Sequence, residues 1–178
     1  MDEVFPQQPV RQWILSLPYP LRFLLANHPE VMSGVLRIVC RCIATHQVRK
    51  TDIKRNKLQA GAVTLIQRFG GALNLNIHFH MLVLDGVFVA SDYDSLRFAS
   101  VKAPFGTELR KLVHTLAHRI GCNLECQGLL GLDAEISYLS ADCLDLGSLA
   151  QLQGASENFM LSGLGCWLLI ARRCCCAC

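Results

Sequence analysis

Two histidines separated by one phenylalanine are the residues of this chain best suited to chemistry. His78 and His80 lie in the apolar run 75–84, which is followed by the dipeptide Asp85-Gly86. Side chains two residues apart on a β-strand point to the same face, so the two imidazoles would project side by side. Two neutral imidazoles converging from one strand make half of a divalent-metal site. The alternative is that both are polar residues on the solvated face of a half-buried strand.

The segments around this pair are predicted to form an antiparallel β-meander with helices. Alternating apolar residues predict strands at 9–17, 61–69, 75–84 and 87–90, with Asp85-Gly86 as a turn between the last two. Apolar residues at three- and four-residue steps predict helices at 21–27, 29–47 and 107–127, the last ending at Gly128. Residues 91–106 are predicted to be a loop.

The composition is typical of a single globular domain with a sizeable core. The 178 residues are 52% hydrophobic, and the longest late apolar run, 164–171, is far shorter than the ~20 residues that cross a bilayer. No signal-peptide pattern opens the sequence, so the chain is expected in the cytosol and away from membranes. In that compartment its ten cysteines are expected to be reduced thiols.

Positive charge is concentrated in the first third of the chain. Residues 1–57 hold nine Lys and Arg against four Asp and Glu, whereas residues 58–178 hold eight against ten. The densest stretch predicts phosphate contacts from Arg49, Lys50, Lys54, Arg55 and Lys57. Such a run is also typical of a solvated loop.

The helix predicted at 107–127 carries a second set of metal-ligand types at four-residue spacing: His114, His118, Cys122 and Cys126. Successive steps of four residues drift by about 40° around a helix axis, so these side chains do not converge on one ion. We interpret them as the solvent-side edge of the helix.

Several stretches together carry a resemblance to a known family. They are VRQWILSLP at 10–18, GAVTLIQRFG at 61–70, LNLNIHFH at 73–80 and LDGV at 84–87, followed by shorter stretches at 112–115, 119–121, 127–130 and 153–156. Over roughly residues 9–160 the chain resembles the rolling-circle insertion-sequence transposases of the HUH (His-hydrophobic-His), two-tyrosine type.

The resemblance implies an α+β fold, in which helices flank a central antiparallel β-sheet with the histidine pair on an inner strand. It implies that His78 and His80 bind Mg²⁺ or Mn²⁺, which polarises a phosphodiester in the single-stranded DNA of a mobile-element end. A tyrosine from a downstream helix then attacks the phosphorus and becomes joined to a 5′ end.

Gln67 is the candidate for a third, oxygen ligand. If the predicted hairpin is symmetric about residues 72–73, Gln67 lies directly opposite His78. A register shift of one residue would remove it from the site, and Gln67 as an ordinary polar face residue is the alternative.

The chain departs from the family at the nucleophile. Its tyrosines are Tyr19, Tyr93 and Tyr138, and none matches the paired-tyrosine motif, so no catalytic residue is assigned. The expectation is a truncated, catalytically incomplete remnant that binds metal and DNA. Two other hypotheses remain open: a module that binds nucleic acid without chemistry, and an unstable pseudogene product.

Three regions are predicted. Residues 1–130 form the transposase-like core without the tyrosine helix, and residues 131–162 partly continue the family region. Residues 163–178, which end in Cys174, Cys175, Cys176 and Cys178, have no amphipathic pattern. They are expected to be an aberrant, unstructured tail, as if translated from another reading frame.

Overall fold

The strand β4 (Leu75–Leu84) has two distinct faces and lies inside the main sheet. The computed structural model describes residues 8–51, 53, 58–70, 75–90, 96–133, 136–139 and 168–173, those from 131 onward by their backbone alone. The β4 side chains at 77, 79, 81 and 83 are buried, whereas those at 76, 78, 80 and 82 are half-buried. This alternation is typical of a strand whose sheet is covered on one face.

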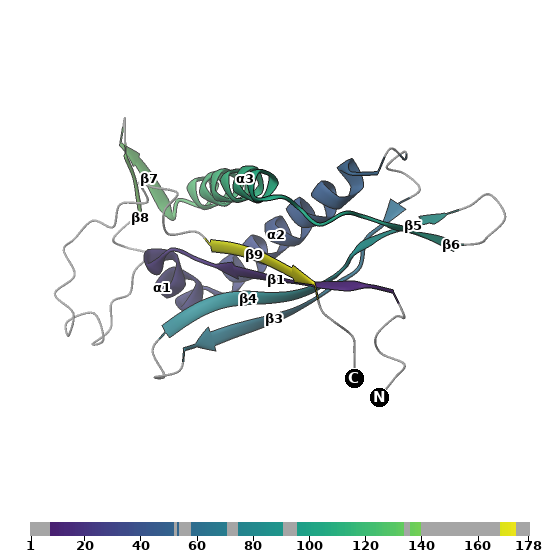
Figure 1. Cartoon of the computed structure of the whole chain (residues 1–178). Coiled ribbons are helices and arrows are strands. Elements are labelled where there is room, and N and C mark those ends of the chain that lie inside the picture. The colour runs from purple at the N-terminus through teal and green to yellow at the C-terminus, as the bar shows by residue number, and fades with distance from the viewer. Residues whose placement is uncertain are drawn as a thin grey trace.

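β4 belongs to a four-stranded antiparallel sheet in the order β3-β4-β1-β9 (Figure 1). Its neighbours are β1 (Val10–Ser16) and β3 (Ala62–Phe69). Gln67 pairs with His78, which confirms the register predicted from the symmetric hairpin, and an irregularity follows between Gln67 and Phe69.

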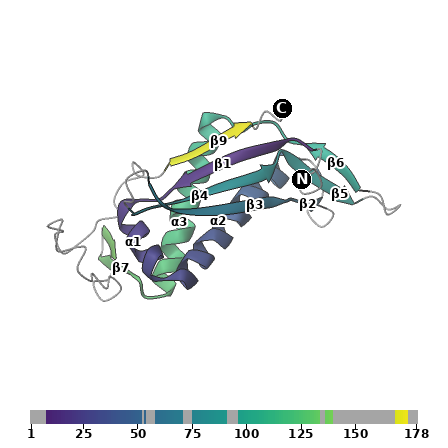
Figure 2. The ribbon, with the colours of Figure 1, turned by 90° about the horizontal axis from the view of Figure 1, so that it is seen from below.

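Three helices cover one face of this sheet (Figure 2). They are α1 (Tyr19–Asn27), α2 (Pro29–Arg49) and α3 (Gly106–Cys126). Their apolar stripes pack with the inward residues of β1 and β4 into one core, in which Trp13, Phe79 and Leu116 are at most 1% exposed. α3 ends in a glycine of positive φ, Gly128 (φ 71°), and the Leu129 and Gly128 amides donate to the carbonyls of Leu124 and Glu125. Gly128 thus terminates the helix as predicted, although the C-cap itself is Gln127, one residue earlier.

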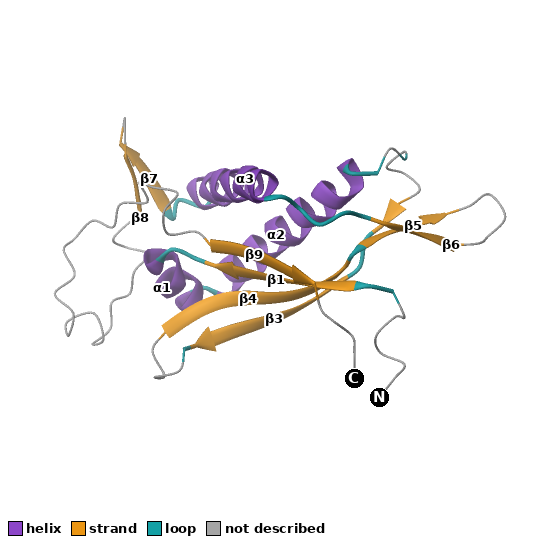
Figure 3. Ribbon diagram, in the orientation of Figure 1, coloured by secondary structure: helices purple, strands orange, loops and turns teal. Residues whose placement is uncertain are grey.

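The chain does not turn back at Asp85-Gly86, so the predicted hairpin is wrong. β5 (Gly86–Ala90) leaves the main sheet and pairs with β2 (Leu58–Gln59) and β6 (Leu96–Ser100) in a second antiparallel sheet (Figure 3). Gly86 is buried, and a Cβ there would strike the Ala99 carbonyl oxygen and the Phe98 ring. Glycine is therefore needed here for the close approach of β5 to β6, and not for a tight turn.

Asp85 is held at the junction of the two sheets by a buried ion pair. Its carboxylate accepts two bonds from the Arg11 guanidinium, Nε to Oδ1 at 2.9 Å and Nη2 to Oδ2 at 2.6 Å. Both side chains are nearly inaccessible, at 7% and 5% exposure. The Asp85 backbone amide also donates to the Pro9 carbonyl, and its own carbonyl accepts from the Val101 amide. This residue thus joins β1, β4 and the end of β6.

Two other segments contain strands that the sequence pattern did not predict. β7 (Leu130–Asp133) and β8 (Ile136–Leu139) pair antiparallel after α3. β9 (Leu168–Arg173) pairs with β1 along the side opposite β4. The prediction of an unstructured tail is therefore wrong for residues 168–173, because backbone pairing needs no side-chain alternation. The cysteines at 174–178 lie outside the described residues.

The α+β prediction, a central antiparallel sheet flanked by helices, is confirmed. The helix predicted at 21–27 begins two residues earlier, at Tyr19, and the segment predicted as a loop at 91–106 contains β6. Among the described helices, none is both long and apolar enough to span a bilayer.

The Arg11–Asp85 pair predicts a specific stability defect. Asp85→Asn leaves the Arg11 guanidinium buried without a counter-charge, so we expect the free energy of unfolding to fall by about 3–5 kcal/mol. Urea denaturation followed by circular dichroism measures it. Arg97→Gln, at an exposed position of β6, is the control and should change it by less than about 0.5 kcal/mol. If Asp85→Asn lowered the free energy of unfolding no more than Arg97→Gln does, the Arg11–Asp85 pair would not be needed for stability.

Candidate functional site

The face of the main sheet opposite the helices carries the histidine pair. Cross-strand partners in an antiparallel sheet point to the same side. His78 and His80 therefore share this face with the residues paired to them or to Leu82: Gln12, Ile14, Ser16, Val63, Leu65 and Gln67. Within the described part of the chain no helix or strand covers this face (Figure 2). We call it the open face.

The two imidazoles lie next to each other, as the spacing predicted. Their ring centroids are 4.8 Å apart and the rings are tilted by 59°. The Nδ1 of His78 lies 2.6 Å from the carbonyl oxygen of Asn76. A carbonyl only accepts, so Nδ1 carries the proton and Nε2 keeps a lone pair. This is the tautomer of a metal-ligating histidine whose other nitrogen is bound to a backbone carbonyl.

His80 is half-buried, and one of its ring nitrogens is fully buried. Its Nδ1 lies 3.4 Å from the amide nitrogen of Gln12, and its buried Nε2 has no hydrogen-bond partner among the described residues. Burial first, and then the neighbouring His78, lower the pKa of His80 below its ordinary value of 6.5. The imidazole is therefore neutral at neutral pH, which is the form that binds metal.

Gln67 lies beside the pair, on the strand that neighbours β4. It pairs with His78 and lines a shallow hollow of about 250 Å³ together with Gln12, His80 and the apolar side chains Val63, Leu65 and Leu82. Its amide nitrogen donates to the carbonyl oxygen of Phe69 at 3.2 Å. No group of three His, Cys, Asp or Glu side chains that could hold a metal occurs in the described part of the chain. A third ligand would have to be of another type, such as the Gln67 amide oxygen.

The predicted phosphate-binding residues that are described do not lie on the open face. Arg49 and Lys50 are at the end of α2, in the helical layer, where Lys50 bonds to Glu108 of α3 at 2.7 Å. Lys54, Arg55 and Lys57 lie outside the described residues. The structure therefore separates Arg49 and Lys50 from the histidine pair by the thickness of the sheet.

On α3, only neighbouring members of the four-residue series approach each other. The thiol of Cys122 lies 3.9 Å from both ring nitrogens of His118, and both side chains are exposed. The four described cysteines, Cys40, Cys42, Cys122 and Cys126, are free thiols.

Two of the three tyrosines lie in described elements, one on α1 and one on β8. Tyr19 is the first residue of α1, 42% exposed, and its ring packs edge-on against Phe23 at 4.8 Å. Tyr138 belongs to β8, where it pairs with Gly131. Tyr93 lies outside the described residues.

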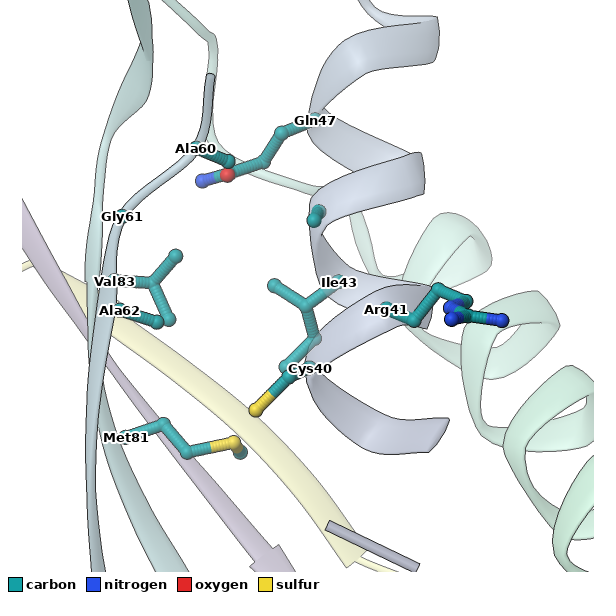
Figure 4. A pocket seen from close by; sticks show the side chains of 10 residues that line it. Cys40, Arg41, Ile43, Gln47, Ala60, Gly61, Ala62, Met81 and Val83 are labelled. Atoms are coloured by element: carbon teal, nitrogen blue, oxygen red, sulfur yellow. The ribbon is translucent and has the colours of Figure 1, made fainter. Parts of the chain in front are cut away.

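A larger cavity lies on the covered side of the sheet, between α2 and the strands β3 and β4. It measures about 420 Å³, and small residues at 60–62 leave the space open. Figure 4 shows the Cys40 thiol and the Met81 thioether entering it from opposite walls, with Gln47 at one end. The Gln47 amide nitrogen donates to the Leu84 carbonyl at 2.6 Å. Because Met81 points away from the open face, this cavity is separate from the histidine pair.

Gln12 and the basic residues Lys111 and Arg119 were not among the site residues predicted from the sequence. The signal for Gln12 was its parity on the first strand, which places it on the same face as His80 once the two strands pair. Lys111 and Arg119 are eight residues apart, and that spacing brings two positions to similar sides of a helix. Both line a hollow with α2.

Comparison with known proteins identifies the family. The family model described as "Putative transposase" matches residues 61–154, which is more than half of the chain and includes the histidine strand. The chain belongs to this transposase family. No curated protein and no solved structure matches it.

The lowered pKa values of two histidines predict how stability depends on pH. Burial, followed by the charge of Lys50, also lowers the pKa of His46 below 6.5. The unfolded chain then binds more protons than the folded chain below 6.5, so the free energy of unfolding should decrease as the pH falls through that value. Denaturation at a series of pH values measures this, and His80→Gln and His46→Gln should each weaken the dependence. A dependence unchanged in both variants would contradict the assignment.

Proposed function

We propose that this chain is the metal- and DNA-binding part of an HUH-type, two-tyrosine transposase, and that it acts on single-stranded DNA from a mobile-element end. One observation carries the proposal: two neighbouring imidazoles on an open sheet face, inside the stretch matched by the transposase family. We place this part in residues 1–130, with residues 131–162 as its continuation.

The donor set fits a hydrated divalent ion. His78 keeps its Nε2 lone pair because Asn76 binds Nδ1, and the Nε2 of His80 is a buried nitrogen without a partner among the described residues. The Gln12 amide can present its oxygen to His80 Nδ1 by a half-turn, which would give His80 the same tautomer as His78. Gln67 would add its amide oxygen, since its bond to Phe69 uses only the amide nitrogen. Two nitrogens and one oxygen suit Mg²⁺ or Mn²⁺ and leave positions for phosphate oxygens.

Such an ion supplies Lewis-acid polarisation of a phosphodiester when it is bound. The chain's own residues would orient the strand. Val63 and Leu65 are 63% and 67% exposed beside the histidines, and they offer apolar surface to unstacked bases. Phe69, 52% exposed at the end of β3, offers a ring on which a base could stack.

The proposal includes no nucleophile from this chain. A covalent intermediate needs a tyrosine oxygen next to the bound phosphodiester, and none of Tyr19, Tyr93 and Tyr138 matches the paired-tyrosine motif in sequence. The competing function is a module that binds nucleic acid without chemistry, and it is favoured because the described part of the chain holds no group of three His, Cys, Asp or Glu side chains that could bind a metal.

Metal binding is the first test. We expect Mn²⁺ to bind the wild-type chain in isothermal titration calorimetry, and the double variant His78→Ala with His80→Ala to lose this binding. The matched control removes the other neighbouring pair of histidines, His114→Ala with His118→Ala on α3, and should bind as the wild type does. Equal binding by the first variant would remove the metal site from the proposal.

Gln67 is tested within the same experiment. Gln67→Ala should weaken Mn²⁺ binding, and Gln67→Glu should strengthen it, since a carboxylate is a better ligand for hard cations than an amide. Unchanged affinity in both variants would assign Gln67 to the sheet surface alone.

The absence of a nucleophile is tested with DNA. We expect no covalent adduct when the chain is incubated with single-stranded oligonucleotides and Mn²⁺ and then separated on a denaturing gel. An adduct that disappears in one of the variants Tyr19→Phe, Tyr93→Phe or Tyr138→Phe would identify a nucleophile and overturn this part of the proposal.

A further inference from the structure

A second polar hollow lies in the helical layer, between α2 and α3. It measures about 370 Å³. The charged or titratable side chains that line it are His46, Arg49, Lys50, Glu108, Lys111 and Arg119, beside Cys42, Leu112 and the threonines Thr45 and Thr115. Four of the six are bases and one is an acid, so the lining is strongly positive. We call this site the helical hollow.

We propose that the helical hollow binds a backbone phosphate of DNA. The site is separate from the histidine pair, because α2 and α3 cover the opposite face of the sheet (Figure 2). DNA would therefore contact the chain on both layers.

The cations of the hollow are available to a ligand. Arg49, Lys111 and Arg119 are exposed, and none of them forms an ion pair within the described part of the chain. Arg119 donates from Nη1 to the Cys42 thiol at 3.5 Å. A thiol is a weak acceptor, so this contact holds the guanidinium at the wall without neutralising it.

The single acid is already neutralised. The Glu108 carboxylate accepts from Lys50 Nζ at 2.7 Å and from the Phe105 amide at 2.8 Å, and these two bonds lower the pKa of Glu108. Lys50 also lies 5.8 Å from the centre of the Phe105 ring. The Lys50–Glu108 pair fixes α2 against α3, and the remaining lining charge is positive.

A histidine in the lining can respond to an anionic ligand. His46 lines the site, and its ring, whose buried Nε2 has no hydrogen-bond partner among the described residues, packs edge-on against Trp13 with 6.5 Å between the ring centroids. Burial and the nearby bases Lys50 and Arg49 lower its pKa, whereas Glu108 acts in the opposite direction. An added anion would favour the protonated ring, which then supplies a further charged donor.

The extent of the positive charge favours a polymer over a small anion. In the sequence, Arg49 and Lys50 open a stretch that also contains Lys54, Arg55 and Lys57. The four cations that line the hollow match the repeated charge of a phosphodiester backbone, to which arginine and lysine supply most contacts.

The test compares two double variants that remove the same charge. Lys111→Gln with Arg119→Gln removes two cations of the hollow, and Arg110→Gln with Arg37→Gln removes two exposed cations outside it. Binding of a labelled oligonucleotide is followed by fluorescence anisotropy over a range of salt concentrations. The first variant should bind more weakly and lose about one unit of salt slope per cation, roughly two in total. The control should keep most of its slope, and equal losses in the two variants would overturn the proposal.

A second measurement identifies the ligand class at the site. Inorganic phosphate should shift the ring resonances of His46 in the wild type and much less in Lys111→Gln with Arg119→Gln. A phosphate response in the wild type with no difference in DNA binding between the two double variants would show a small-anion site and overturn the assignment to DNA.

The phosphate site and the proposed metal site can be tested independently of each other. Lys111→Gln with Arg119→Gln should still bind Mn²⁺, which also shows that the variant is folded. His78→Ala with His80→Ala should keep the salt slope of the helical hollow.

Discussion

The buried contact between Arg11 and Asp85 fixes the point at which the two sheets meet, and the placement of the histidines depends on it. Asp85 follows β4 directly, and its side chain and backbone bind β1, the residue before β1 and the residue after β6. A carboxylate taken from water is stable only with such complete pairing. Since the end of β4 cannot slide past Arg11, the register of the whole strand is set from this end.

The same register decides which face of the sheet carries the two histidines. Ile77, Phe79 and Met81 are fully buried, and each such side chain gains roughly 1.5–3 kcal/mol from leaving water. A slip of one residue would exchange them with His78 and His80, which would bury two imidazoles and expose three large apolar groups. The core therefore holds the histidines on the open face.

Local periodicity predicted the elements that one stretch of chain can define. The alternation of β4, the apolar stripes of α2 and α3, and the Gln67–His78 register all follow from residues close in sequence. The hairpin predicted at Asp85-Gly86 is wrong because the turn signal is local, whereas the Arg11 that binds Asp85 is 74 residues away. β9 and the helical hollow could not be predicted for the same reason. β9 is defined by its pairing with β1, and Arg49 and Arg119 line one hollow only after α2 packs against α3.

The two proposed sites divide charge between the two layers, and this division has a physical reason. A divalent cation at the histidine pair is repelled by every nearby lysine and arginine, and this repulsion falls with distance and is screened over about 10 Å at 0.1 M salt. DNA binding, in contrast, needs those cations. Neutral imidazoles and amides on the open face, with Arg49, Lys111 and Arg119 across the sheet, would satisfy both demands of the proposed sites. The phosphate charge at the metal would then be compensated by the ion, and the charge of the remaining backbone by the helical layer.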